Sequence, residues 1–279
     1  MIVQEELEAR YANKVQAAAA CFMHADHVTA AFAQMGLGEA GAVLVDALGG
    51  AGLRVPDLRA KAREVHEQGQ LLAVDNTVPS SFGCNPFVLG ADVALEALDR
   101  VAAGDLDSKV VAVSLRKGCR LEEARLESDA LQPCDLDAIA CGLDSMDARM
   151  QVHFDHARAL AEYLRCVDGL ASVSYPGCSN HPDHGIAART LMHGFGPALD
   201  FELPPEWGIH ADEFIASCRL NGRTCPAGGS HTRLHARDGA DGLAVRIFAG
   251  LDDPLAIADD LDSAFRTLRS RGITLDTVY

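Results

Sequence analysis

The sequence predicts an α/β protein built on a mostly parallel sheet with helices on both faces. Continuous apolar runs, typical of strands that are buried on both sides, alternate with stretches of helical periodicity. The strand-like runs lie at Gly41–Leu48, Gln70–Asn76, Ala91–Glu96 and Lys109–Leu115.

Two predicted helices and a later change of pattern define the domains. Pro56–Glu67 opens with a proline and places Leu58, Ala62 and Val65 on one face. A longer amphipathic helix is expected from about Met146 to Arg165. We therefore expect one domain over residues 1–150 and a C-terminal α/β domain over 151–279, with this helix bridging them. The second domain has strand-like runs at Ala171–Tyr175, Ala198–Leu203 and Leu243–Phe248, and a last helix that opens at Asp253-Pro254 and extends to about Arg269.

The composition predicts a cytoplasmic protein that binds neither nucleic acid nor membranes. The 279 residues carry a formal net charge of −16, spread along the chain, which repels polyanions and anionic lipid. No apolar run approaches the roughly 20 residues that span a bilayer, and Glu5, Glu6 and Glu8 do not suit a signal peptide. Nine irregularly spaced cysteines without a C-x-x-C string predict no disulfide framework or zinc knuckle.

Three H-x-D-H strings place two imidazoles three residues apart with a carboxylate between them: His24–His27, His153–His156 and His181–His184. Such a pair can bind a metal, but nothing in the sequence brings the three strings together. We expect hydrogen-bonded or solvated histidines and no metal site.

The most informative segment is Leu71–Asp92, LLAVDNTVPSSFGCNPFVLGAD. Asp75 ends a buried strand, and ligands of open α/β sheets bind at the carboxyl ends of strands. A carboxylate there can pair with the ring nitrogen of a cofactor, or it can simply start a turn. In either case Asp75 is expected to be solvated or hydrogen-bonded, because a buried unpaired carboxylate is costly.

Several segments, in order, resemble the Cys/Met-metabolism family of pyridoxal-phosphate (PLP) enzymes, which includes cystathionine γ-synthase, cystathionine γ-lyase, cystathionine β-lyase and methionine γ-lyase. The resemblance implies the PLP-dependent transferase fold of type I, with a large PLP domain and a smaller C-terminal domain, and a homo-oligomer, either dimer or tetramer. The segments are Leu53–Asp92 with VDNT and GAD, Cys141–Met150 (CGLDSMDARM), Tyr175–His184 (YPGCSNHPDH), Gly194–Leu203 (GFGPALDFEL, against GFGG..SFEL in the family) and Val245–Asp253 (VRIFAGLDD).

The resemblance also implies roles for three residues. Asp75 would face the pyridine nitrogen of PLP, with Thr77 beside it, and Arg246 would bind the carboxylate of a substrate. Arg246 is equally consistent with a salt bridge between the domains at a strand end.

The departures from the family pattern lie at the cofactor. After GAD the family has a strand ending in S-x-T-K, whose lysine forms the Schiff base and whose hydroxyls hold the phosphate. Here Ala97, Asp99 and Arg100 take these places, and a guanidinium cannot form an imine. Lys109 on the next strand is the least implausible stand-in. The amino-terminal part is also about a hundred residues shorter than in the family, and the resemblance implies that the missing part would bear the phosphate loop.

These departures predict a non-catalytic pseudoenzyme of the trans-sulfuration family, without covalently bound PLP, that acts as a partner or scaffold for an active paralogue. Two alternatives stay open. One is a PLP-dependent lyase or transferase of sulfur amino acids with a displaced lysine. The other is a binder of a small amino acid that uses the remnant cleft and Arg246.

Overall fold

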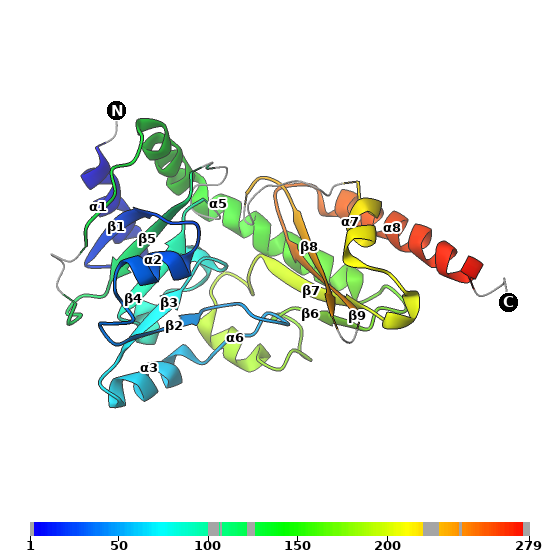
Figure 1. The fold of residues 1–279 in the computed structure, drawn as a ribbon, viewed down its shortest axis with the longest axis horizontal. Helices are drawn as coiled ribbons and strands as arrows, with labels where there is room; N and C mark the ends of the chain where they lie inside the picture. The colour runs from blue at the N-terminus through cyan, green and yellow to red at the C-terminus, as the bar shows by residue number, and fades with distance from the viewer. Residues whose placement is uncertain are drawn as a thin grey trace.

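The computed structural model describes residues 3–99, 106, 108–121, 126–219, 229–239 and 242–275. Two sheets lie side by side, and one long helix passes from the first to the second (Figure 1). The first half contains α1 (Gln4–Val15), β1 (Ala19–His24), α2 (Val28–Gln34), β2 (Ala42–Asp46), α3 (Leu58–Glu67), β3 (Leu71–Asp75), α4 (Ser80–Gly83), the 3-10 turn η1 (Phe87–Leu89), β4 (Val93–Ala97) and β5 (Val110–Leu115). The second contains α5 (Pro133–Leu164), β6 (Ser172–Ser174), α6 (His184–Thr190), β7 (Ala198–Leu203), the 3-10 turn η3 (Pro205–Trp207), α7 (Ala211–Ser217), β8 (Arg233–Gly239), β9 (Gly242–Phe248) and α8 (Pro254–Leu275).

The first sheet is mixed, so the expectation of a mostly parallel sheet holds in part: the predicted strands β2, β3 and β4 are parallel, and β5 is reversed. Its strand order is β1-β5-β4-β3-β2. Strands β2, β3 and β4 run parallel, whereas β5 is antiparallel to both β4 and β1. The four predicted strands all form, with ends that differ by a few residues. Their direction was not predictable, because a run that is apolar on both faces looks the same whichever way its neighbour runs.

Helices cover both faces of this sheet. On one face α2 packs against the odd-numbered residues of the strands, such as Ala73, Leu95 and Val113. On the other face α1 and the first part of α5 pack against Val110 and Ala112, and α3 packs against Leu72 and Val74. Alternate residues of a strand point to opposite faces, so each strand presents a separate set of side chains to each helical layer.

The second sheet is antiparallel, in the order β6-β7-β9-β8. Buried residues of β7 and β9 pack against the last turns of α5 and against α8 to form a second core. Three of the strands were predicted. The edge strand β8 was not, because its sequence RLHARDG alternates charged residues with small or apolar ones and lacks a continuous apolar run.

The long helix α5 joins the two cores (Figure 1). It begins at Pro133, much earlier than the predicted start near Met146, with the proline in its first turn. Met150 and Phe154 still belong to the first core, whereas Ala157 and Leu160 belong to the second. The expected boundary near residue 150 thus falls inside this helix, close to the point where its contacts change. Among the described residues, no helix is long and apolar enough to cross a membrane.

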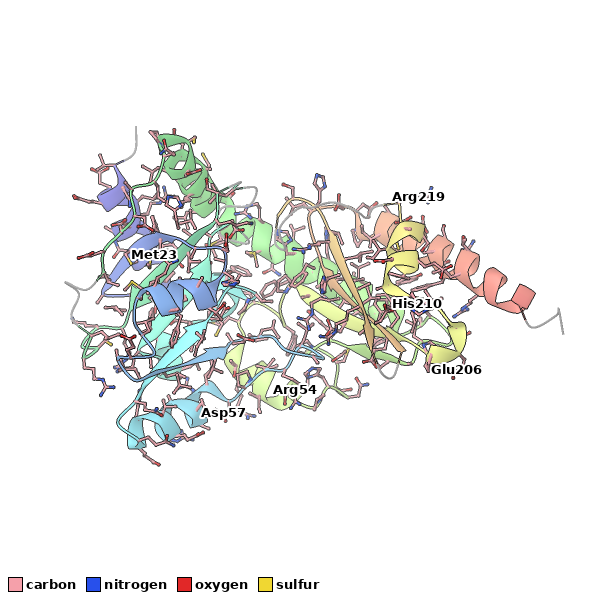
Figure 2. The ribbon with its side chains drawn as sticks, in the orientation of Figure 1. Met23, Arg54, Asp57, Glu206, His210 and Arg219 are labelled. Atoms are coloured by element: carbon pink, nitrogen blue, oxygen red, sulfur yellow. The ribbon has the colours of Figure 1, made fainter. Side chains whose placement is uncertain are left out.

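The segment after β2 reaches from the first half to the second, where Figure 2 labels Arg54 near α6. The Arg54 guanidinium donates to Asp183 at 2.5 and 2.9 Å, and the Val55 N–H donates to the same carboxylate at 3.1 Å. His181 and Ser174 contact the carbonyl oxygen of Gly52, at 2.9 and 2.8 Å. The YPGCSNHPDH motif therefore anchors this segment.

A turn after β9 holds the second sheet against α5. His153 and His156 of α5 contact the carbonyl oxygens of Ala249 and Gly250, at 2.5 and 2.9 Å between nitrogen and oxygen. Gly250 packs so closely on the neighbouring chain segment that an added Cβ would overlap the backbone of His231 and Thr232. This position therefore tolerates only glycine.

We expect Gly250→Ala to lower the free energy of unfolding by about 3 kcal/mol, because backbone atoms cannot move aside as a flexible side chain can. Gly185→Ala is the matched control, since its Cβ would lie 3.7 Å from the nearest atom, in a helix that favours alanine. Denaturant unfolding of both variants measures the difference. Equal stability of the two would contradict the close approach.

Candidate functional site at the strand ends

The carboxyl end of β3 carries the acidic residue that the sequence singles out. Asp75 is half-buried, and its Oδ1 accepts a hydrogen bond from the Thr77 N–H at 2.9 Å. The expected polar partner is thus present. Thr77 Oγ1 accepts a hydrogen bond from the Ala97 N–H at 3.0 Å. The two predicted cofactor-binding residues therefore lie together and tie the end of β3 to the end of β4.

An ion pair between the buried carboxylate of Asp99 and the exposed Lys109 lies just beyond the end of β4. The side chain of Asp99 is 3% exposed, and its Oδ2 accepts a hydrogen bond from Lys109 Nζ at 2.6 Å. Lys109 lies just before β5, the strand that pairs with β4. Arg100, which the sequence places at the lysine position of the family, lies outside the described residues.

The guanidinium of Arg246, on β9, is held by groups of the protein itself. It contacts both carboxylate oxygens of Asp200 on β7, at 2.7 and 2.8 Å, and donates to the carbonyl oxygen of Gly50 at 2.5 Å. Asp200 also accepts a hydrogen bond from the Gly52 N–H at 3.0 Å. The salt bridge therefore joins two neighbouring strands of the second sheet, and not the two halves as the alternative from sequence had it. The halves are joined here by the hydrogen bonds with Gly50 and Gly52.

Arg246 lies near the same strand ends as Asp75. Asp46 is the register partner of Asp75 across β2 and β3. Burial raises the pKa of Asp46, and the positive charge of Arg246 acts against that rise. A cavity of about 230 Å³ opens beside Arg246 and is lined by Gly50, Ala51, Asp200, His235, Arg237, Ala244 and Val245.

The histidine strings do not form a metal site among the described residues. His27 caps α2 by accepting a hydrogen bond from the Ala30 N–H at 3.1 Å. The histidines at positions 153, 156, 181 and 184 each contact a backbone carbonyl. These five histidines are hydrogen-bonded, as the sequence leads us to expect.

The comparison with known sequences shows the family. The profile of the Cys/Met metabolism PLP-dependent enzymes matches residues 11–266, and the chain belongs to that family. The match begins well before the motifs from which the resemblance was drawn. Cystathionine γ-lyase of Sus scrofa is 29% identical over 234 residues, and O-succinylhomoserine sulfhydrylase of Pseudomonas aeruginosa is 31% identical over 215. These alignments cover 77% and 71% of this chain, but only 57% and 53% of the relatives.

Solved structures show the same fold. Apo CalE6, a methionine γ-lyase from Micromonospora echinospora, superimposes with a TM-score of 0.81 at 23% identity, over 94% of this chain and 86% of that chain. Cystathionine γ-lyase from Lactobacillus plantarum, complexed with L-serine, also gives 0.81, at 18% identity and the same coverage. At this level of identity the likeness supports the fold alone.

The residues at the strand ends fit PLP poorly. Asp75 can still face a pyridinium nitrogen. The position of a phosphate-binding hydroxyl, however, holds the buried carboxylate of Asp99, which repels a phosphate dianion. Lys109 cannot readily serve as the nucleophile, because its ammonium group is paired with that carboxylate and only a neutral amine attacks an aldehyde. No reaction step through PLP is derived from this arrangement.

Sequence reasoning missed Glu96, which is the last residue but one of β4 and is 2% exposed. The signal was available, since an acidic residue inside the apolar run VALEA is an exception that needs a cause. Its Oε2 accepts hydrogen bonds from the Tyr11 hydroxyl and the Ser81 N–H, both at 3.2 Å. Burial raises the pKa of Glu96 to about 8; the negative charge of Asp75 adds to the rise, and the two hydrogen bonds and Lys14 oppose it.

This shift sets the direction of the pH dependence. An unfolded glutamate titrates near pH 4.3, so the folded protein binds the extra proton between that pH and about 8. The contribution of Glu96 to the free energy of unfolding is fully present below pH 4.3 and falls as pH rises through this window, by at most about 1.4 kcal/mol per pH unit. We expect the wild type to lose about 2 kcal/mol more than Glu96→Gln between pH 5.5 and 7.5, measured by urea unfolding. Parallel curves for the two proteins would show that Glu96 is not a buried neutral acid.

Proposed function

We propose that this chain keeps the fold of its family without the PLP chemistry and acts as a non-catalytic partner or scaffold, as a pseudoenzyme. The observation that carries this proposal is the ion pair of the buried Asp99 with the exposed Lys109. It puts a carboxylate where the family pattern has a phosphate-binding hydroxyl. The family's Schiff-base lysine is replaced by Arg100, and the pair also occupies Lys109, the least implausible substitute for that lysine.

The environment of Arg246 supports the same proposal. In the family this arginine would bind a substrate carboxylate, but here the carboxylate of Asp200 already binds the guanidinium through both of its oxygens. Asp200 stands at the serine of the family string SFEL. A free amino acid would have to displace an intramolecular carboxylate, which disfavours both the lyase and the binder that use this cleft.

A scaffold needs a partner, and we propose another copy of this chain or an active relative. The chain spans about 57% of the length of the curated relatives that it matches. The resemblance to the family implies a homo-oligomer, and we extend that expectation to this chain. We expect a homodimer or larger assembly by light scattering at micromolar concentration; a monodisperse monomer would refute self-association and leave only the active relative as partner.

The absence of PLP chemistry is tested by Arg100→Lys, which we expect not to restore covalent PLP binding. Repulsion between the phosphate and an unpaired carboxylate at about 4 Å would cost about 4 kcal/mol at an effective dielectric near 20, roughly a thousandfold in affinity, and this is an upper bound for Asp99 because Lys109 offsets part of its charge. PLP is titrated into the wild type, this variant and the triple variant Arg100→Lys, Asp99→Thr, Ala97→Ser. Borohydride reduction and peptide mass spectrometry then locate any adduct.

The wild type controls for adducts at its own lysines, Lys14, Lys61, Lys109 and Lys117. A stoichiometric adduct at position 100 of the single variant, or at Lys109 of the wild type, would overturn the proposal and favour a PLP-dependent enzyme.

A further inference from the structure

A cavity of about 290 Å³ lies beneath α1, on the face of the first sheet that carries α1, α3 and α5. Its lining includes Tyr11 of α1, Ala94 and Glu96 of β4, and Ser114 of β5. Ala97 packs on the opposite face of the sheet, and neighbouring residues of a strand point to opposite sides. The cavity is therefore separate from the strand-end site of Asp75, Thr77 and Asp99, and its capacity to bind a ligand does not depend on the proposed function.

Three unpartnered polar atoms belong to residues that line this cavity. Glu96 Oε1, Asn76 Oδ1 and Ser81 Oγ are buried and have no hydrogen-bond partner among the described residues, and all three residues line the cavity. The other polar atoms of Glu96 and Asn76 are used, since Oε2 of Glu96 accepts two hydrogen bonds and Nδ2 of Asn76 donates to the Cys84 carbonyl at 3.1 Å. One carboxyl oxygen, one amide oxygen and one hydroxyl at the wall of the cavity are thus unpaired, and a ligand reaches these buried atoms when their side chains rotate toward it.

Leaving such groups unpaired is costly, and native proteins rarely do so. The amide oxygen only accepts hydrogen bonds, and an ionised carboxylate does the same. A group that donates several hydrogen bonds and carries positive charge, such as a primary ammonium, satisfies all three at once.

The outer part of the cavity carries positively charged side chains. Arg59 of α3 and Arg189 of α6 are exposed there, and Lys14 of α1 is partly exposed and paired with Asp147. The walls between the acceptors and these cations are mostly apolar and include Val15, Cys84, Phe87 and Leu89. Positive charge at the rim suits an anionic group.

We propose that this cavity binds a short zwitterion, with its ammonium group against Glu96, Asn76 and Ser81, its carboxylate near Arg59 and Arg189, and an apolar chain between them. The chemical class is a small amino acid whose two charged groups are separated by a few methylenes. The cavity is at the lower limit of the volumes of small-molecule sites, which suits a ligand of this size.

Ligand binding at this site is expected to release a proton from Glu96, which can be measured. Glu96 is mostly protonated at pH 7, because burial raises its pKa to about 8. An ammonium group placed against it favours the carboxylate, so binding releases up to about one proton. The other titratable or charged groups that face Glu96 are Tyr11, Lys14 and Asp75, with Arg59, Cys84 and Arg189 elsewhere on the lining. The pKa of Tyr11 is raised by burial, so this phenol stays neutral at pH 7.

The test is calorimetric titration of the full chain with three matched probes: 5-aminopentanoate, pentylamine and pentanoate. We expect saturable binding of 5-aminopentanoate with Kd below about 1 mM, about tenfold weaker binding of pentylamine, and no binding of pentanoate. At pH 7 the observed binding enthalpy should depend linearly on the ionisation enthalpy of the buffer. The slope should correspond to the release of about one proton.

Four variants locate the site. Glu96→Gln keeps the shape of the side chain and should weaken binding at least about tenfold while abolishing proton release. Arg189→Gln should weaken 5-aminopentanoate but not pentylamine. Ala94→Leu fills the cavity without touching a charge and should abolish binding, which keeps the test decisive if Glu96→Gln is poorly folded. Glu67→Gln, exposed at the end of α3, is the matched control and should bind as the wild type does.

The proposal would be overturned if no probe gave heat up to about 10 mM, since water alone would then satisfy the cavity. Binding that survives both Glu96→Gln and Ala94→Leu would also overturn it. So would pentylamine binding as tightly as the zwitterion, or pentanoate binding more tightly than pentylamine.

Discussion

Two carboxylates of the second half, Asp183 and Asp200, fix the arrangement on which the rest of the molecule depends. Together they hold the segment after β2, through Arg54, the Val55 N–H and the Gly52 N–H. The hydrogen bonds from Arg54 keep the pKa of Asp183 below its ordinary value, so this carboxylate is ionised at neutral pH. Because β2, β3 and β4 pair side by side, holding the end of β2 also positions the strand ends that carry Asp75 and Ala97.

The same arrangement changes what Arg246 can do. An arginine between two halves of a protein can bind a ligand or bind the protein, and its neighbours decide which. With serine at position 200 the guanidinium would keep one strong partner, the Gly50 carbonyl. With Asp200 it has a bidentate carboxylate that is itself fixed by the Gly52 N–H. A substrate carboxylate could bind the Arg246 guanidinium only by breaking its ion pair with Asp200, and this would leave the Asp200 carboxylate without its charged partner.

The sequence predicted the features that depend on local pattern, and missed those that depend on pairing. The helix with Leu58, Ala62 and Val65 on its buried face and the strands ending at Asp75 and Leu115 are encoded by periodicity and apolar runs. The mixed direction of the first sheet depends on which strands become neighbours, which a run of apolar residues does not encode. For Arg246 the residues left two roles open, since neither Asp200 nor Gly50 is near it in the chain. Glu96 was passed over because its environment is made by α1, about eighty residues away.

Strand β4 separates two environments that differ in how their charges are satisfied. After its end, the charged groups Asp99 and Lys109 neutralise each other, and Thr77 is used to join β3 to β4. On the α1 face, Glu96 lies against a cavity with one oxygen unpaired, beside Asn76 and Ser81. Since free polar groups bind ligands and paired ones hold structure, the capacity to bind a small molecule lies on the face of β4 away from the family's cofactor position. The loss of the family's chemistry that we propose for one site is therefore compatible with the binding site that we propose on the other face of the sheet.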